Sequence, residues 1–318
     1  MSTGAQTPRQ SPEPRPRAWF RGRRRRSERV IEALLVVAAV VSIATTIGIV
    51  VALAEPTIGF FQRVNVGEFF TGVSWTALFQ NPKYGVLPLL VATLVTTMIA
   101  IVIAVPLGLG SAAYLSEYAS AGARKFLKPI LEILAGVPTV VYGAFALFAI
   151  GPLLRQYWPG SEQPEFQNML IAGIAMGIMI VPTVASLAED AMSAVPSSLR
   201  EGAYALSSSK MQVCMRVVGP AAISGIIAAV VLGLSRAIGE TMIVTIAAGA
   251  TSNQIEWDPT HGALTMTGYI AQAGLGDLPV SSFDYRTIFA VGAVLFVFTF
   301  LLNAFSIRMV RKFREVYE

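Results

Sequence analysis

The chain has 318 residues, of which 54% are apolar and only 14% are charged. Soluble domains carry about 25% charged residues, and disordered chains are charge-rich and apolar-poor, so the composition excludes both classes. The apolar content and a mean hydropathy of +0.62 instead indicate a multi-pass membrane protein, because each span needs about 20 apolar residues.

The first segment, residues 1–29, is strongly basic. It contains nine arginines, including the run from Arg23 to Arg26, and several prolines that disfavour a helix. Such a segment has two interpretations, a nucleic-acid-binding patch or a solvated tail at the anionic cytoplasmic face of a membrane. Nothing after it resembles a nucleic-acid-binding domain, so we predict a basic disordered cytoplasmic tail and no nucleic-acid partner.

Six stretches without Asp, Glu, Lys or Arg follow the tail, and each is long enough to cross a bilayer. They are residues 33–54, 84–116, 133–154, 166–188, 217–235 (followed closely by 241–255) and 287–307. The first stretch is too long for the apolar part of a secretory signal peptide, and no clear cleavage site follows it. The predicted fold class is therefore all-α, a polytopic membrane protein with six transmembrane helices.

The basic residues of the connections set the predicted orientation. Nineteen Lys and Arg lie in the two tails and in connections 116–132 and 189–216, whereas only four lie in the alternate connections. Cytoplasmic connections carry an excess of Lys and Arg. We therefore expect a plasma-membrane protein with both termini cytoplasmic.

Motifs for catalysis or metal binding are missing from the sequence. Cys214 and His261 are the only residues of their kinds, which excludes an internal disulfide and leaves few ways to build a metal or catalytic site. There is also no phosphate-binding GxxxxGK[ST] loop, no HExxH motif and no GxSxG elbow. We predict no catalytic residue, no metal and no cofactor in this chain, and a channel or an intramembrane enzyme is the least favoured alternative.

Connection 189–216 is the longest polar stretch between spans. Ser197 or Ser198 is expected to cap a helix that begins near Leu199, with Glu201 in its first turn near the positive end of the helix dipole. A short amphipathic helix at this place has two interpretations. It either lies on the membrane surface or docks a cytoplasmic partner.

Two ionisable residues, Arg236 and Glu240, lie inside the predicted fifth span. Residues four apart share one face of a helix at roughly 6 Å. A charge near the bilayer centre costs at least ~2.5–3.5 kcal/mol, which makes intramembrane ions functional candidates. Either the two neutralise each other and fix helix packing, or Arg236 binds an anion with its guanidinium donors while Glu240 is its counter-charge. We favour the anion pathway.

Proline residues at two positions are expected to interrupt the backbone ladder inside spans. Pro138 precedes Thr139, and Pro182 precedes Thr183. Freed carbonyls and these hydroxyls either line a polar path or belong to ordinary packed kinks. Thr139 and Thr183 are therefore candidate pathway residues.

The segment Glu201, Gly202, Ala203, together with Pro220, resembles the EAA loop of ABC importer permeases. Three positions depart from the pattern: Gly202 replaces an alanine, Ser207 stands at the usual glycine, and Gly219 stands at the usual leucine. In this family the loop is a coupling helix that sits in a groove of the ATPase subunit. The resemblance thus assigns ATPase coupling to Glu201, Gly202 and Ala203.

Four further segments resemble the phosphate importer permeases, the PstC and PstA pair. They are RAIGET at 236–241, AGVPTVVYG at 135–143, PTVASLAEDA at 182–191 and AYLSEY at 113–118. The acidic residues directly after the fourth span favour the PstC type. The resemblance implies a type I ABC importer (MetI-like) permease fold, with residues 30–85 as first helix and outer loop, 86–308 as the type-1 permease domain and 309–318 as a short cytoplasmic tail.

The resemblance also implies a complex. Its other members would be a PstA-type sister permease, a cytoplasmic dimer of ATP-binding subunits that hydrolyses ATP, and an extracytoplasmic phosphate-binding protein that meets loops 56–83 and 250–286. Inorganic phosphate would move inward by alternating access, past Arg236, Glu240, Thr139 and Thr183. The alternatives are the PstA-type subunit or a permease of the same architecture for sulfate or molybdate.

Overall fold

The computed structural model describes residues 26–250, 253–276, 278–279 and 282–312. Most of the predicted N-terminal tail and the end of the C-terminal tail lie outside these residues. The chain divides into two compact units, Met1–Ala52 and Leu53–Glu318. The second unit is called the body below.

The first two-thirds of the chain has helices in the first four predicted spans and further helices in the connections between them. They are α1 (Arg26–Phe61), α2 (Val66–Thr71), α3 (Leu87–Ala113), the π-helical turn η1 (Tyr114–Tyr118), α4 (Ala121–Ala135), α5 (Thr139–Phe145), the π-helical turn η2 (Ala146–Ile150), α6 (Gly151–Gln156) and α7 (Met169–Ser193). The described part of the chain is thus helical, and its β-pairing is limited to two isolated bridges, Ser74 with Gln254 and Trp75 with Tyr84.

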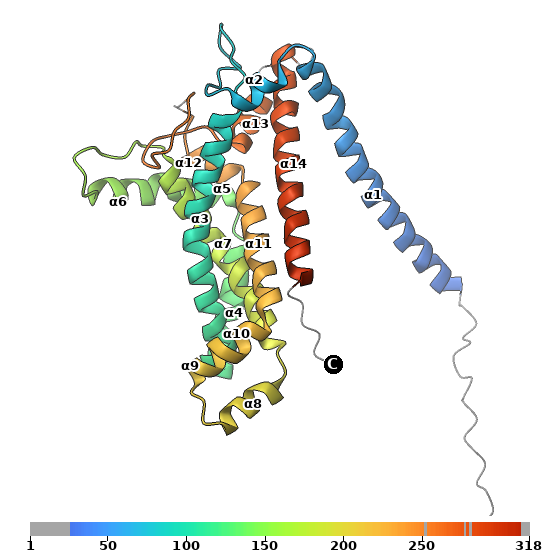
Figure 1. Ribbon diagram of the computed structural model, residues 1–318, viewed down its shortest axis with the longest axis vertical. Coiled ribbons are helices and arrows are strands. Elements are labelled where there is room, and N and C mark those ends of the chain that lie inside the picture. Colours follow the sequence, from blue (N-terminus) through green and yellow to red (C-terminus); the bar gives the residue numbers. More distant parts are fainter. Residues whose placement is uncertain (1–25, 251–252, 277, 280–281, 313–318) are drawn as a thin grey trace, which may run out of the picture. The chain divides into compact units, whose positions relative to one another are not determined.

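The remaining helices alternate between long and short. They are α8 (Ser197–Ala205), α9 (Lys210–Val213), the π-helical turn η3 (Cys214–Val218), α10 (Gly219–Ala221), α11 (Ile223–Ile238), α12 (Met242–Ala247), α13 (Met266–Leu275) and α14 (Phe283–Lys312). In Figure 1, α8 lies at one end of the body and α2 and α13 lie at the other. These are called the α8 end and the α13 end.

The predicted all-α membrane fold is confirmed, although one of the six spans is not a continuous helix. Five helices are long and apolar enough to cross a membrane, and a sixth span exists only if Lys210–Ala221 and Ile223–Ile238, bent by 76°, form one span together. The third span begins at Thr139, later than the predicted residue 133, because α4 ends at Ala135 and the continuous helix Thr139–Gln156 follows. Pro138, with φ −57° and ψ 135°, stands in the break, as expected for a residue that lacks a backbone donor.

The centre of the body is the contact between α3 and α7. Glycines on α7 make this contact close: a Cβ built on Gly173 would lie 2.7 Å from the Cβ of Ile99, and one on Gly177 would lie 2.9 Å from that of Ile103. Small residues at such positions allow helix backbones to approach in a membrane. The two helices therefore form a tightly packed pair against which α4, α11 and α12 pack.

The α13 end contains a separate core of aromatic rings. Phe60, Phe69, Trp75 and Tyr269 are each at most 2% exposed, and the rings of Trp75 and Tyr269 meet edge to face at 4.9 Å. These residues come from α1, α2, α13 and the connection before α3. The connections at this end therefore form a packed layer rather than loose loops.

Candidate functional site

The helix that carries Arg236 ends two residues later. Helix α11 stops at Ile238, Gly239 forms its C-cap, and α12 begins at Met242. The prediction that Arg236 and Glu240 share one helical face is therefore wrong. Glycine is a common terminator of helices, and here it falls between the two ionisable residues.

Arg236 lies between α11 and α7. Its guanidinium donates a hydrogen bond to the Thr183 hydroxyl at 3.1 Å and lies 3.9 Å from the Met179 sulfur. One turn earlier, the backbone of Gly233 packs against Ile180 and Val184 of α7. The structure thus brings together two of the predicted pathway residues, Arg236 and Thr183.

Glu240 has partners of its own. Its side-chain oxygen accepts hydrogen bonds from the backbone N–H groups of Met242 at 3.2 Å and Ile243 at 3.4 Å, so it caps the first turn of α12. Its carbonyl accepts a bond of 2.7 Å from the Thr267 hydroxyl of α13. Glu240 therefore fixes the junction between α11, α12 and α13.

No ion pair joins Arg236 to Glu240 within the described residues, where the recorded pairs involve other groups. The recorded contacts of Arg236 are with a neutral hydroxyl and a thioether. A half-buried guanidinium without a carboxylate partner is electrostatically incomplete in an apolar body, since charges in membranes are normally paired. The arrangement suits the binding of an anion.

Thr139 is the first residue of α5 and is half-buried directly after Pro138. The hydroxyl of Tyr142 donates to the carbonyl of Leu134 at 2.9 Å and so bridges the break between α4 and α5. Among the described residues, no recorded hydrogen bond joins Thr139 to Arg236. Pro182, in contrast, lies inside α7, which continues through it, so only one of the two prolines ends a helix.

Helix α8 corresponds to the predicted cytoplasmic helix but begins earlier than expected. It starts at Ser197, with Pro196 at the N-cap and no side-chain cap hydrogen bond. The predicted serine cap is therefore wrong. The proline ring, whose fixed φ suits the start of a helix, takes that place.

The end of α8 explains one departure from the EAA pattern. Ser207 has φ 60°, in the left-handed region. The Ser207 N–H donates to the Tyr204 carbonyl at 2.9 Å, and the Ser208 N–H donates to the Ala203 carbonyl at 3.2 Å. These two bonds form a Schellman motif, which normally has glycine at the left-handed position. The serine at this position thus adopts the conformation that a glycine adopts more easily.

The residues predicted for ATPase coupling divide between two faces of α8. Glu201 and Gly202 are exposed, whereas Ala203 is half-buried and packs on an apolar cluster that includes Ala188 of α7 and Val218 of η3. Large apolar side chains are also exposed at this end: Tyr204 41%, Leu206 84%, Met211 58% and Met215 64%. These four residues are called the α8-end surface.

A buried ionic cluster at the α8 end was not predicted from the sequence. The Glu189 side chain of α7 is 1% exposed and pairs with Arg124 and Lys128 of α4. Lys128 also pairs with Asp190 at 2.8 Å, and the hydrogen bond to Asp190, followed by the one to Glu189, raises the pKa of Lys128. The sequence signal was present, since Glu189 directly follows an apolar stretch and the basic residues lie in connection 116–132. The cluster fastens α4 to α7.

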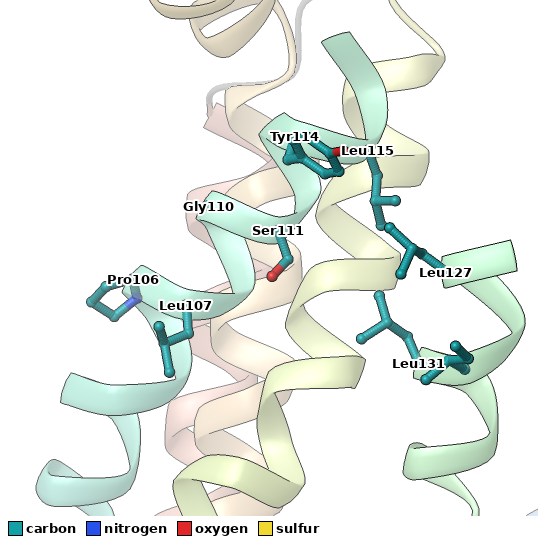
Figure 2. A pocket seen from close by; sticks show the side chains of 9 residues that line it. Pro106, Leu107, Gly110, Ser111, Tyr114, Leu115, Leu127 and Leu131 are labelled. Atoms are coloured by element: carbon teal, nitrogen blue, oxygen red, sulfur yellow. The ribbon is translucent and has the colours of Figure 1, made fainter. Parts of the chain in front are cut away.

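A groove between α3 and α4 is shown in Figure 2. It has a volume of about 410 Å³ and is lined mainly by apolar side chains, among them Leu107, Tyr114, Leu127 and Leu131. None of the predicted pathway or coupling residues lines it. An oxyanion requires hydrogen-bond donors and positive charge, so this groove is not the candidate site for one.

The fold is that of a membrane transport subunit. The chain belongs to the family of binding-protein-dependent transport system inner membrane components, whose model matches residues 104–315. It is thus the permease subunit of an ABC importer, a multi-pass protein of the plasma membrane and a transport subunit rather than an enzyme. Such importers work with ATP-binding and substrate-binding partners.

Several relatives match most of the chain. A protein of Bacillus subtilis described as a probable ABC transporter permease, YqgH, is 35% identical and covers 83% of this chain and 84% of its own length. The phosphate transport system permease protein PstC of Mesorhizobium japonicum is 34% identical, covering 75% and 76%. The protein PstC 1 of Mycobacterium tuberculosis is 33% identical, covering 79% and 83%.

Solved structures show the same fold at low sequence identity. A chain of a bacterial alginate ABC transporter matches with a TM-score of 0.62 and 17% identity, covering 90% of this chain and 95% of its own. A chain of the MetNI methionine ABC transporter matches with a TM-score of 0.53 and 20% identity, covering 73% and 95%. These matches agree with the predicted type I importer fold.

Proposed function

We propose that this chain is the PstC-type permease of an ATP-driven importer and forms part of the translocation pathway for inorganic phosphate. The observation that carries the proposal is the half-buried Arg236, which contacts neutral groups and has no ion pair within the described residues. The PstC proteins among its relatives support phosphate as the substrate.

The geometry around Arg236 suits a transient anion site. A guanidinium presents N–H groups in a planar fork that matches the oxygens of phosphate. Arg236 contacts the Thr183 hydroxyl and the Met179 sulfur, and an arriving anion would replace these weaker contacts. Thr183 would then be free to bond the anion as well, while Thr139 lines the path at the start of α5.

Glu240 would act on Arg236 at longer range, as its counter-charge when no anion is present. Its cap on α12 and its link to Thr267 of α13 would also connect the site to the α13 end. Opening of the site toward one side of the membrane would therefore be coupled to movement of the junction between α11, α12 and α13. This is the kind of element that alternating access requires.

The α8 end is proposed to face the cytoplasm, together with both termini, because nineteen of the 24 Lys and Arg lie in the two tails and in connections 116–132 and 189–216, and these two connections are at this end. Glu201, Gly202 and the α8-end surface would dock on a dimer of ATP-binding subunits that hydrolyses ATP. At the opposite end, loop 56–83 and the described part of loop 250–286 would meet a phosphate-binding protein. A PstA-type sister permease would complete the pathway.

The direct test is uptake of labelled phosphate by cells that contain or lack this chain, with the other transporter subunits present in both. We expect ATP-dependent accumulation only when the chain is present. Excess sulfate or molybdate should leave it unchanged. Loss of phosphate uptake under either competing oxyanion would favour a permease for that anion, and accumulation without the ATPase subunit would indicate a channel.

A further inference from the structure

Arg200 lies in the first half of α8, next to the exposed Glu201, but its side chain points into the protein. It is 19% exposed and pairs with Glu117, which is 5% exposed. Both Nε and a terminal guanidinium nitrogen donate to the same Glu117 oxygen at 3.1 Å. Two donors on a buried carboxylate hold the partners in one orientation.

The same guanidinium also reaches the end of α7. It donates to the carbonyl of Val195 at 2.6 Å and to the carbonyl of Met192 at 2.8 Å. These carbonyls belong to the last turn of α7 and the residues that follow, where helices leave acceptors unsatisfied. Arg200 therefore links α8, which carries it, to the end of α7 and to Glu117 of η1.

Glu117 lies in a π-helical turn at the end of α3, where the Ala119 N–H donates to the Tyr114 carbonyl at 2.8 Å. Turns of this kind are rare and occur frequently at functional sites. On another side of η1, Tyr114 and Leu115 line the groove of about 410 Å³ that separates this turn from Leu127 of α4 (Figure 2). At the groove, η1 is therefore not closely packed against α4.

We propose that Arg200 is a positioning residue that transmits movement of α8 to α3 and α7, acting through Glu117 and the carbonyls of Met192 and Val195. This inference rests on the proposed coupling role of α8. The exposed face of α8 would receive the movement of the ATPase, and Arg200 would pass it inward. The two helices that it reaches, α3 and α7, are the tightly packed pair at the centre of the body, and α7 carries Thr183.

The test is the number of phosphate ions moved per ATP hydrolysed by the full reconstituted transporter. Because Arg200→Gln removes the guanidinium that bonds Glu117 and the carbonyls of Met192 and Val195, we expect it to lower this ratio about tenfold while ATP hydrolysis continues. Glu117→Gln should lower it similarly, and the double variant should be no worse than the poorer single variant, since both remove one linkage. Arg200→Lys, which keeps the charge but loses the fork, should retain an intermediate ratio.

The matched control is Arg216→Gln, because Arg216 is exposed in η3 and has no recorded partner among the described residues. It should keep the unmodified ratio. An unchanged ratio in Arg200→Gln, or a fall in assembly and hydrolysis with the ratio preserved, would overturn the inference. If Arg200→Gln does not assemble, Glu117→Gln and Arg200→Lys carry the same test. A separate result would contradict phosphate as the substrate: the unmodified complex would hydrolyse ATP but move no phosphate.

Discussion

Two charged regions of the body differ in how their charges are neutralised. At the α8 end, Glu189 is 1% exposed and meets two cations, and Glu117 at 5% exposure meets Arg200. At the α11–α7 contact, Arg236 meets a hydroxyl and a sulfur, while Glu240 caps another helix. The paired charges fasten helices together, whereas Arg236, which has no acidic partner among the described residues, is suited to a ligand that arrives from outside.

The largest expected effect belongs to Arg236. Arg236→Gln should lower phosphate uptake about 10- to 100-fold, since a hydrogen bond to a charged group contributes ~1.5–3 kcal/mol. It should leave thermal stability equal or higher, because a half-buried charge without a carboxylate partner is removed. Uptake by Arg236→Lys should lie between that of the unmodified chain and that of Arg236→Gln, because lysine keeps the charge but not the bidentate fork. Uptake at equal membrane levels and the Tm of the purified complex measure both effects, and a large fall in Tm would contradict this view of Arg236.

The opposite pattern is expected for Glu189. Glu189→Gln leaves Arg124 and Lys128 without their buried partner, and breaking such pairs costs up to ~3–5 kcal/mol. Because both cations are about one-third exposed, we expect a loss of roughly 1–3 kcal/mol in the free energy of unfolding. Uptake should fall only in proportion to the amount of assembled protein. Lys125→Gln on the same helix is the control and should change stability by about 0.5 kcal/mol or less.

Glu240 offers a smaller effect that separates two roles. Glu240→Gln keeps an oxygen that can accept from the Met242 and Ile243 N–H groups but removes the charge. Glu240→Ala removes both and should cost a further ~1 kcal/mol of stability, the usual contribution of a helix cap. If the cap dominates, Gln should retain uptake within about threefold while Ala does not; equal losses of uptake in both variants would assign the effect to the charge.

The smallest effect is expected at Ser207. A non-glycine residue in the left-handed region carries a strain of ~1–2 kcal/mol, which a substitution by glycine relieves. Glycine also makes the unfolded chain more flexible, and this offsets part of the gain in stability. Ser207→Gly should therefore stabilise the protein by roughly 0.5–1 kcal/mol and leave the ratio of phosphate to ATP unchanged. A fall in Tm would show that the Ser207 side chain contributes contacts that outweigh the strain.

Much of the fold could be predicted because its signals are local. Long apolar stretches predict the spans, and the break at Pro138 follows from the missing backbone donor. The end of α11 was missed because Gly239, between Arg236 and Glu240, is a single weak signal, and transmembrane helices often contain glycine. The N-cap of α8 was also predicted wrongly, since serine caps are more frequent than proline at that position.

The site was predicted in part for a related reason. The type of residue identified Arg236 as a candidate, because charges are costly in a membrane, and the contact with Thr183 places a second predicted residue beside it. The partners of Glu189 and Arg200 lie 61 to 83 residues away along the chain, and no local pattern indicates which of several basic residues each acid meets. Such pairings follow from helix packing rather than from spacing in the sequence.

The central claim is that phosphate passes Arg236. Its most direct test is ATP-driven accumulation of labelled phosphate in vesicles that contain the reconstituted transporter and saturating binding protein, with either the unmodified chain or Arg236→Ala. The unmodified complex should accumulate phosphate, and the variant should assemble and hydrolyse ATP but accumulate at least about tenfold less. Accumulation by Arg236→Ala within twofold of the unmodified rate would contradict the claim.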